Sequence, residues 1–235
     1  MSNYLNYLQN ISTPRTFQRK CDYFRYNYGK IIFSKNKHAN KILEIGPGLG
    51  EFISYLNSQE IENIDVVDND DDILRYIKSK FKVNRIFKAR RLPVIEKDLA
   101  MYDLIVSTQA IEHIPKTQYR EFLTILYDHL NKNGLLIITV PNMGNPFTIC
   151  ERYADLTHHN GFTDISLKEL ANYCEFEKAT VYVKGFAIPP YSVINLMRIL
   201  FQKILHTLIL FASIINGGTY SRFLTPNITL IIKKG

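Results

Sequence analysis

The chain has 235 residues, of which 46% are hydrophobic, so it is long and apolar enough to bury a sizeable core. Lys and Arg exceed Asp and Glu by 29 − 22 = 7, a basic balance that favours acidic partners such as nucleic acid, anionic lipid or acidic glycan. The three cysteines, Cys21, Cys150 and Cys174, match no zinc spacing and indicate plain thiols in a reducing, cytoplasmic setting. We recognise no signal peptide, and no run reaches the roughly 20 apolar residues of a membrane span.

Residues 1–40 are polar, basic and rich in tyrosine, and we expect them to form a helical lid segment before the main fold. Short apolar strands and amphipathic helices then alternate with short connections, which predicts a parallel sheet covered by helices. The expected strands are 41–45, 64–68, 85–89, 102–107, 135–140, 179–184 and 227–233. The expected helices are 51–57, 71–81, 116–130 and 167–174, the last capped by Ser166 with Glu169 closing a capping box.

The segment 189–225 interrupts this pattern with apolar residues at helical spacing. We expect one or two apolar helices outside a core formed by 41–188 and 226–235. Three interpretations stay open: the insertion packs on its own domain or covers the substrate pocket, it forms a homodimer interface, or it touches a membrane surface through 191–215.

A glycine-rich turn, Gly46-Pro47-Gly48-Leu49-Gly50, follows the first strand and opens a helix. Glycines there let a ligand approach the backbone closely. The spacing differs from the dinucleotide pattern, and a carboxylate at Glu44 would repel a pyrophosphate. Both features favour a ligand with an ammonium or sulfonium charge, such as S-adenosylmethionine, and disfavour an NAD-dependent oxidoreductase. Asp68, at the end of the second strand, is placed to accept hydrogen bonds from ribose hydroxyls.

With these residues the sequence resembles class I S-adenosylmethionine-dependent methyltransferases of the type 11, 12 and 23 group. The resemblance covers roughly 15–185 and the final strand. It rests on LEIGPGLGEF (43–52), VVDND (66–70), YDLIVSTQAIEHI (102–114), LNKNGLLIITVPN (130–142) and HHNGFT (158–163). It implies a Rossmann-like, seven-stranded mixed α/β sheet with its last strand antiparallel, sandwiched by helices.

The resemblance also implies a cofactor site. Glu44, Gly46 and Gly48 would line the methionine part, Asp68 would bind the ribose, and Asn69 would lie beside the adenine. Gln109 would lie near the methionine end. Lys88 stands where the family usually has an acid, so backbone groups of Ala89 are expected to replace that side chain in adenine recognition.

Transfer to a hydroxyl acceptor requires a general base. His158, which matches an H-x-x-x-F element of the family, is the preferred candidate, and His113 in the Glu112-His113 pair is the weaker one. The acidic and histidine residues of the loop after the fifth strand form no tight ligand set in the sequence, so we expect no metal.

The chain is also similar to small methyltransferases found with bacterial surface-polysaccharide synthesis. That analogy implies O-methylation of a sugar or lipid-linked glycan by a cytoplasmic enzyme, peripheral at the inner face of the membrane if the insertion binds lipid. The alternatives are a tRNA, rRNA or small-molecule methyltransferase, and a non-catalytic Rossmann-like interaction module. A nucleic-acid partner is disfavoured because no recognised RNA-binding module is present.

Overall fold

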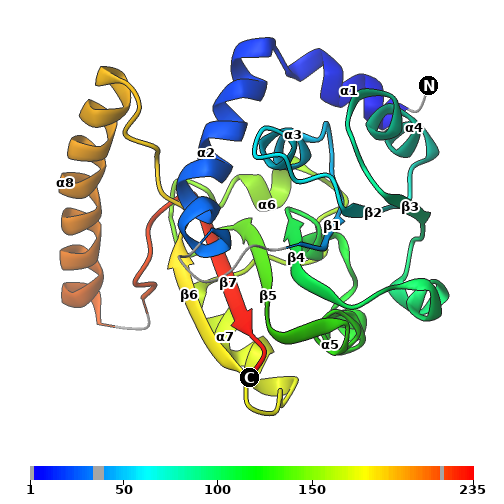
Figure 1. The fold of residues 1–235 in the computed structure, drawn as a ribbon. Coiled ribbons are helices and arrows are strands. Elements are labelled where there is room, and N and C mark those ends of the chain that lie inside the picture. Colours follow the sequence, from blue (N-terminus) through cyan, green and yellow to red (C-terminus); the bar gives the residue numbers. More distant parts are fainter. Residues whose placement is uncertain (1–2, 34–39, 218–219) are drawn as a thin grey trace.

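A computed structural model describes residues 3–33, 40–217 and 220–235. It contains a single sheet whose strands run in the order β3-β2-β1-β4-β5-β7-β6 (Figure 1). β1 to β5 pair in parallel, and β7 is antiparallel to both of its neighbours. The predicted seven-stranded mixed sheet with an antiparallel last strand is therefore confirmed. Its strands are β1 (Ile42–Ile45), β2 (Ile64–Asp68), β3 (Arg85–Lys88), β4 (Tyr102–Thr108), β5 (Leu130–Pro141), β6 (Thr180–Gly185) and β7 (Asn227–Lys233).

Helices cover both faces of the sheet. They are α1 (Asn3–Ile11), α2 (Pro14–Ile32), α3 (Glu51–Asn57), α4 (Asp71–Lys80), α5 (Tyr119–Asp128), α6 (Glu151–Ala154), α7 (Asp164–Tyr173) and α8 (Val193–Asn216). One buried cluster joins α2, α3 and α4 to the strands, and a second joins α5 and α7 to the opposite face. Short 3₁₀ turns lead from β3 to β4 and from β4 to α5.

The N-terminal segment begins as expected with helices, but α2 is more than a lid. Phe24, Tyr28 and Ile32 are buried in the same cluster as Phe52 of α3. The Tyr28 hydroxyl is also hydrogen-bonded to Thr139 on β5. Since these contacts reach the central strands, α2 forms part of the core, whereas among residues 4–11 of α1 only Leu5 is buried.

The cap of α7 differs from the sequence expectation. Thr163 is the N-cap, and its hydroxyl accepts a hydrogen bond from the Ser166 backbone N–H at 3.2 Å, while the Ser166 hydroxyl receives the Thr163 N–H at 2.9 Å. The predicted Ser166–Glu169 capping box is therefore wrong. Two hydroxyl residues three apart satisfy each other, and the helix begins three residues earlier than expected.

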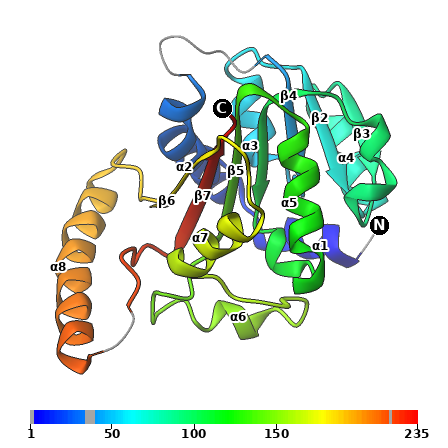
Figure 2. The ribbon, with the colours of Figure 1, turned by 90° about the horizontal axis from the view of Figure 1, so that it is seen from below.

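The apolar insertion forms one helix, α8, which stands beside the sheet (Figures 1 and 2). Across its 24 residues, all of them within the described part of the chain, it buries no side chain. By length and composition α8 could cross a membrane, with a mean hydropathy of 1.6. The sequence expectation that no segment reaches that length is corrected here, because polar residues such as Arg198, Gln202 and His206 interrupt the apolar run in the sequence but not the helix.

Candidate active site

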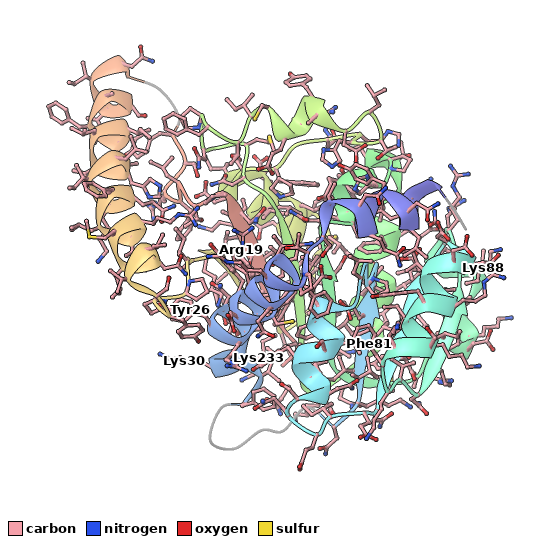
Figure 3. All side chains as sticks on the ribbon, turned by 90° about the horizontal axis from the view of Figure 1, so that it is seen from above. Arg19, Tyr26, Lys30, Phe81, Lys88 and Lys233 are labelled. Atoms are coloured by element: carbon pink, nitrogen blue, oxygen red, sulfur yellow. The ribbon has the colours of Figure 1, made fainter. Side chains whose placement is uncertain are left out.

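The glycine-rich turn lies where β1 ends and α3 begins, at the carboxyl edge of the parallel strands. Gly46 and Gly48 have φ of +69° and +55°, values that favour glycine. A Cβ atom on Gly48 would meet no atom closer than 3.9 Å, so the backbone there faces open space. Gly50 has a different role, because its Cβ would lie 2.4 Å from the ring of Phe81, a residue labelled in Figure 3. Gly48 thus leaves room for a ligand, whereas a Cβ on Gly46 would lie 3.3 Å from the Cβ of Ala110, and Gly50 serves packing.

Glu44 is a buried carboxyl group beneath this turn, only 3% exposed. Its Oε2 atom has no hydrogen-bond partner among the described residues. Burial, with smaller contributions from the charges of Glu51 and Asp68, raises the pKa of Glu44 to about 8. An orphaned acid facing a glycine turn fits a ligand that brings a positive charge.

Asp68 ends β2 and points its carboxylate into the same space. Its Oδ1 atom accepts a hydrogen bond from the Asp70 backbone N–H at 2.9 Å, which fixes the side chain. Burial raises the pKa of Asp68 to about 6 even though hydrogen bonds from the Asp70 and Asn69 N–H groups oppose that shift. Asp70 itself caps α4, and its side chain accepts a hydrogen bond from the Asp72 backbone N–H at 2.8 Å.

The segment after β3 is the expected adenine side. Lys88, at the edge of the molecule in Figure 3, forms an ion pair with Asp71 on α4. The Ala89 N–H donates to the Asp68 carbonyl at 2.9 Å, so it is already engaged. The backbone group at Ala89 that suits an adenine amino group is therefore its carbonyl oxygen.

Gln109 follows β4 with φ of +51°, an uncommon value for a residue with a side chain. Its N–H donates to the Thr139 carbonyl at 2.8 Å, which holds the backbone in place. Strained backbone of this kind persists where the surrounding structure enforces it and is frequent at functional sites.

All seven predicted cofactor residues line one cavity of about 2610 Å³. They are Glu44, Gly46, Gly48, Asp68, Asn69, Ala89 and Gln109. Side chains of α1 and α2 form another wall, including Tyr4, Tyr7, Arg19, Lys20 and Tyr23. The aromatic and basic N-terminal segment was the sequence signal for this wall, although no single residue of it could be assigned.

The two candidate bases occupy different positions. His113 lines the cavity, whereas His158 does not. The rings of His113 and His158 are in contact, with centroids 4.7 Å apart, and the Nδ1 atom of His158 lies 3.0 Å from the Glu151 carbonyl. His159 also lines the cavity. The geometry therefore favours His113 over His158 for contact with an acceptor.

A chain of hydrogen bonds supports His113. The Thr157 hydroxyl donates to Asp155 Oδ1 at 2.6 Å, and the Nδ1 atom of His113 lies 2.8 Å from the same hydroxyl oxygen. Because the Thr157 proton is given to Asp155, the Nδ1–H of His113 must be the donor in the second bond. Nε2 of His113 then keeps its lone pair. Burial, followed by the nearby His158, lowers the pKa of His113 and favours this neutral form.

Glu112 lies beside the two histidines. It is 2% exposed, and neither carboxyl oxygen has a hydrogen-bond partner in the described part of the chain. Burial raises its pKa to about 8. One ligand-type atom from each of Glu112, His113 and His158 lies within 4.8 Å of the others, a grouping of metal-ligand types that the sequence did not bring together.

The fold and the cavity define a Rossmann-like enzyme that binds a ligand with a ribose and a positively charged tail. The profile of a family described as a methyltransferase domain matches residues 16–178. The chain belongs to this methyltransferase family, and its methyl donor is S-adenosylmethionine. The donor fits the residues present, since Glu44 lacks a partner that an ammonium group would supply.

Solved structures agree with this fold. A SAM-dependent methyltransferase from Archaeoglobus fulgidus is 19% identical with a TM-score of 0.67, covering 99% of this chain and 100% of its own. The plantazolicin methyltransferase BpumL, in complex with a monoazolic desmethylPZN analogue and SAH, is 17% identical with a TM-score of 0.60. The match covers 98% of this chain and 88% of BpumL. The methyltransferase domain of bacterial CtHen1 is 16% identical with a TM-score of 0.62, and the match covers 92% of this chain and 99% of that domain. No curated protein matches the chain.

Proposed function

We propose that this methyltransferase transfers a methyl group to a hydroxyl of a sugar or lipid-linked glycan in surface polysaccharide synthesis, in the cytoplasm at the inner face of the membrane. The observation that carries the proposal is the cavity that joins the Glu44–Asp68 site to His113. Its volume of about 2610 Å³ far exceeds the roughly 300–1,000 Å³ usual for a small-ligand site, so it has room for a large acceptor beside the cofactor.

The lining beyond the cofactor site suits a polyhydroxylated or phosphorylated acceptor. It includes cations from three different parts of the chain and the polar side chains of Gln118 and Asn145. The cations are Arg19, Lys20, Arg90, Arg91 and Arg198. Lys20 is partly neutralised by Glu51, 2.9 Å away, and Arg91 by Glu121, 2.8 Å away, whereas the charges of Arg19, Arg90 and Arg198 favour an anionic group on the acceptor.

The proposed mechanism uses the neutral His113 as the base. S-Adenosylmethionine supplies an electrophilic methyl group when bound. Nε2 of His113 accepts the acceptor hydroxyl proton, while Thr157 and Asp155 hold the ring in the required tautomer. Positioning the acceptor oxygen in line with the methyl group supplies much of the remaining acceleration. Tyr4 of α1 lines the same cavity, and its pKa is raised by partial burial and by the charges of Asp68 and Asp155.

An RNA substrate is the second candidate, supported by the net charge of +7. Binding through phosphates would be strongly salt-dependent, whereas binding of a single glycan would not. A peptide or other small molecule is a further alternative, since a plantazolicin methyltransferase shares the fold. A non-catalytic module is disfavoured by the family and by the orphaned Glu44.

The test is release of S-adenosylhomocysteine with nucleotide sugars, lipid-linked glycans, small phenols, a peptide and RNA as acceptors. The proposal expects turnover with a glycan, and loss of that turnover in His113→Ala. Turnover with RNA, phenol or peptide and none with any glycan would contradict it.

A further inference from the structure

The polarity of α8 is inverted relative to an ordinary surface helix. The side chains turned toward the body of the protein are half-buried and recur at steps of four and three residues. They are Asn195, Ile199, Gln202, His206, Ile209 and Ser213, with Leu210 beside Ile209, so four of the seven are polar. A helix packed on a soluble core would place its apolar stripe on that side, but here most of the stripe is polar.

The opposite side of α8 is a continuous apolar strip, which we call the outer face. It consists of Val193, Met197, Leu200, Ile204, Leu208, Phe211 and Ile215, which are 47% to 76% exposed. A 24-residue helix is about 36 Å long at 1.5 Å per residue. An apolar strip of that length on a protein surface marks a membrane or protein contact.

The charges at the edges of this outer face are all positive. Arg198 and Lys203 flank the strip, and α8 contains no acidic residue. Arg19 of α2 adds a third cation nearby, since Arg198 and Arg19 both act on the pKa of Tyr23, and Figure 3 shows Arg19 on the side of α2 toward α8. Cations bordering an apolar strip match anionic lipid headgroups above hydrocarbon. In a symmetric dimer formed through the outer face, the same surface of both copies would meet. The cations of one copy would then lie close to those of the other and repel them.

The connections of α8 show how it can meet a bilayer. It is inserted between β6 and β7, which are hydrogen-bonded neighbours in the sheet, so both ends of the insertion return to one side. A helix that crossed the bilayer would need the segment before β7 to cross back as irregular chain, which hydrocarbon does not tolerate. It would also expose Gln202 and His206 to lipid. A helix lying in the plane of the surface avoids both costs.

We propose that α8 lies in the surface of an anionic bilayer, with the outer face in the acyl region and the polar stripe toward the protein. Arg198, Gln202 and His206 also line the cavity, so the cavity borders the bilayer. If the proposed glycan methylation holds, its acceptor is an amphiphile that stays anchored in the bilayer while its headgroup enters the cavity.

The experiment measures flotation of the whole protein with vesicles of phosphatidylcholine, with or without phosphatidylglycerol. Ile204→Glu/Leu208→Glu places two charges in the middle of the outer face. Tyr153→Glu/Tyr173→Glu is the matched control, because it adds the same charge at exposed aromatic residues of other helices, α6 and α7. We expect the wild type and the control to float with anionic vesicles, and the α8 variant to partition at least about tenfold more weakly. Calorimetry with S-adenosylmethionine checks that each variant is folded.

A second readout is independent of those variants. In a Cys150→Ser background, which removes the exposed native thiol, a fluorophore attached to Ile204→Cys should be quenched by lipids brominated in the acyl chain, whereas one attached to Gln202→Cys should not. Absence of vesicle binding by the wild type, equal binding by the α8 variant, or equal quenching at 202 and 204 would overturn the proposal. A lipid-free dimer that dissociates in the α8 variant, without vesicle binding, would assign the outer face to a second copy instead. Since flotation needs no acceptor, these failures leave the proposed methylation untouched.

Discussion

Nδ1 of His113 lies 2.8 Å from Oγ1 of Thr157, and this contact sets which nitrogen of the ring faces the cavity as a base. We predict that His113→Ala lowers turnover by about 10²- to 10⁴-fold, the usual contribution of a general base. Affinity for S-adenosylmethionine should stay the same. Thr157→Val should lower turnover less, because it removes the acceptor that holds the Nδ1–H of His113. The same acceptor stabilises the charged form of His113, so its loss should move the acidic limb of the pH profile to lower pH. Steady-state kinetics and calorimetry on both variants check this, and full turnover in His113→Ala would remove His113 from the chemistry.

His158 lies behind His113, and its contribution can be separated into packing and hydrogen bonding. We predict that His158→Ala lowers turnover at least about tenfold and leaves cofactor binding intact. His158→Phe keeps a ring against His113 but loses both nitrogens. Turnover restored by phenylalanine would assign His158 a packing role, and full activity in both variants would retire it from the site.

Glu44 makes cofactor binding depend on pH. Its pKa is raised to about 8 in the free protein by burial, so it holds a proton at neutral pH. An ammonium partner favours the ionised form, and binding therefore releases that proton. Affinity should rise from about pH 6 to about pH 8, by up to about tenfold per unit, since one pKa unit corresponds to about 1.4 kcal/mol.

Calorimetry in buffers of different ionisation enthalpy measures the proton release directly. Glu44→Gln is the matched control, which should bind weakly and without the pH dependence. Affinity that is the same from pH 6 to pH 8 in the wild type would contradict a role for Glu44 at a cationic group.

The sequence predicts that no metal is needed, although the structure brings Glu112, His113 and His158 within 4.8 Å of one another. We therefore expect turnover to be unchanged after dialysis against a chelator. A loss that Mn²⁺ or Zn²⁺ restores in the wild type, but not in Glu112→Gln, would show that these three residues form a metal site.

The sequence was sufficient for the sheet and for the prediction of seven residues that line one cavity, because both follow from local patterns. Gly46, Gly48 and Asp68 come directly after strands, and the carboxyl ends of parallel strands meet at one edge. The acceptor side depends on the loop path between β5 and α7, which no periodicity specifies. His158 therefore could not be placed behind His113, nor Thr157 and Asp155 beside it.

Backbone bonding and helix orientation were also beyond local patterns. The hydrogen bond from the Ala89 N–H to the Asp68 carbonyl depends on the pairing of β3 with β2. The apolar spacing of α8 predicted a helix, but only the tertiary arrangement shows that its polar stripe faces inward. A helix whose polar stripe faces the protein has the same sequence period as one whose apolar stripe does.

The central claim is that Glu44, Asp68 and the glycine turn form the site of the methyl donor. Calorimetric titration of S-adenosylmethionine into the wild type and Asp68→Ala tests it most directly. The account predicts micromolar-range binding to the wild type and at least about tenfold weaker binding to the variant, since hydrogen bonds to a charged acceptor contribute about 1.5–3 kcal/mol each. No binding to the wild type, or equal dissociation constants for the two proteins, would contradict it.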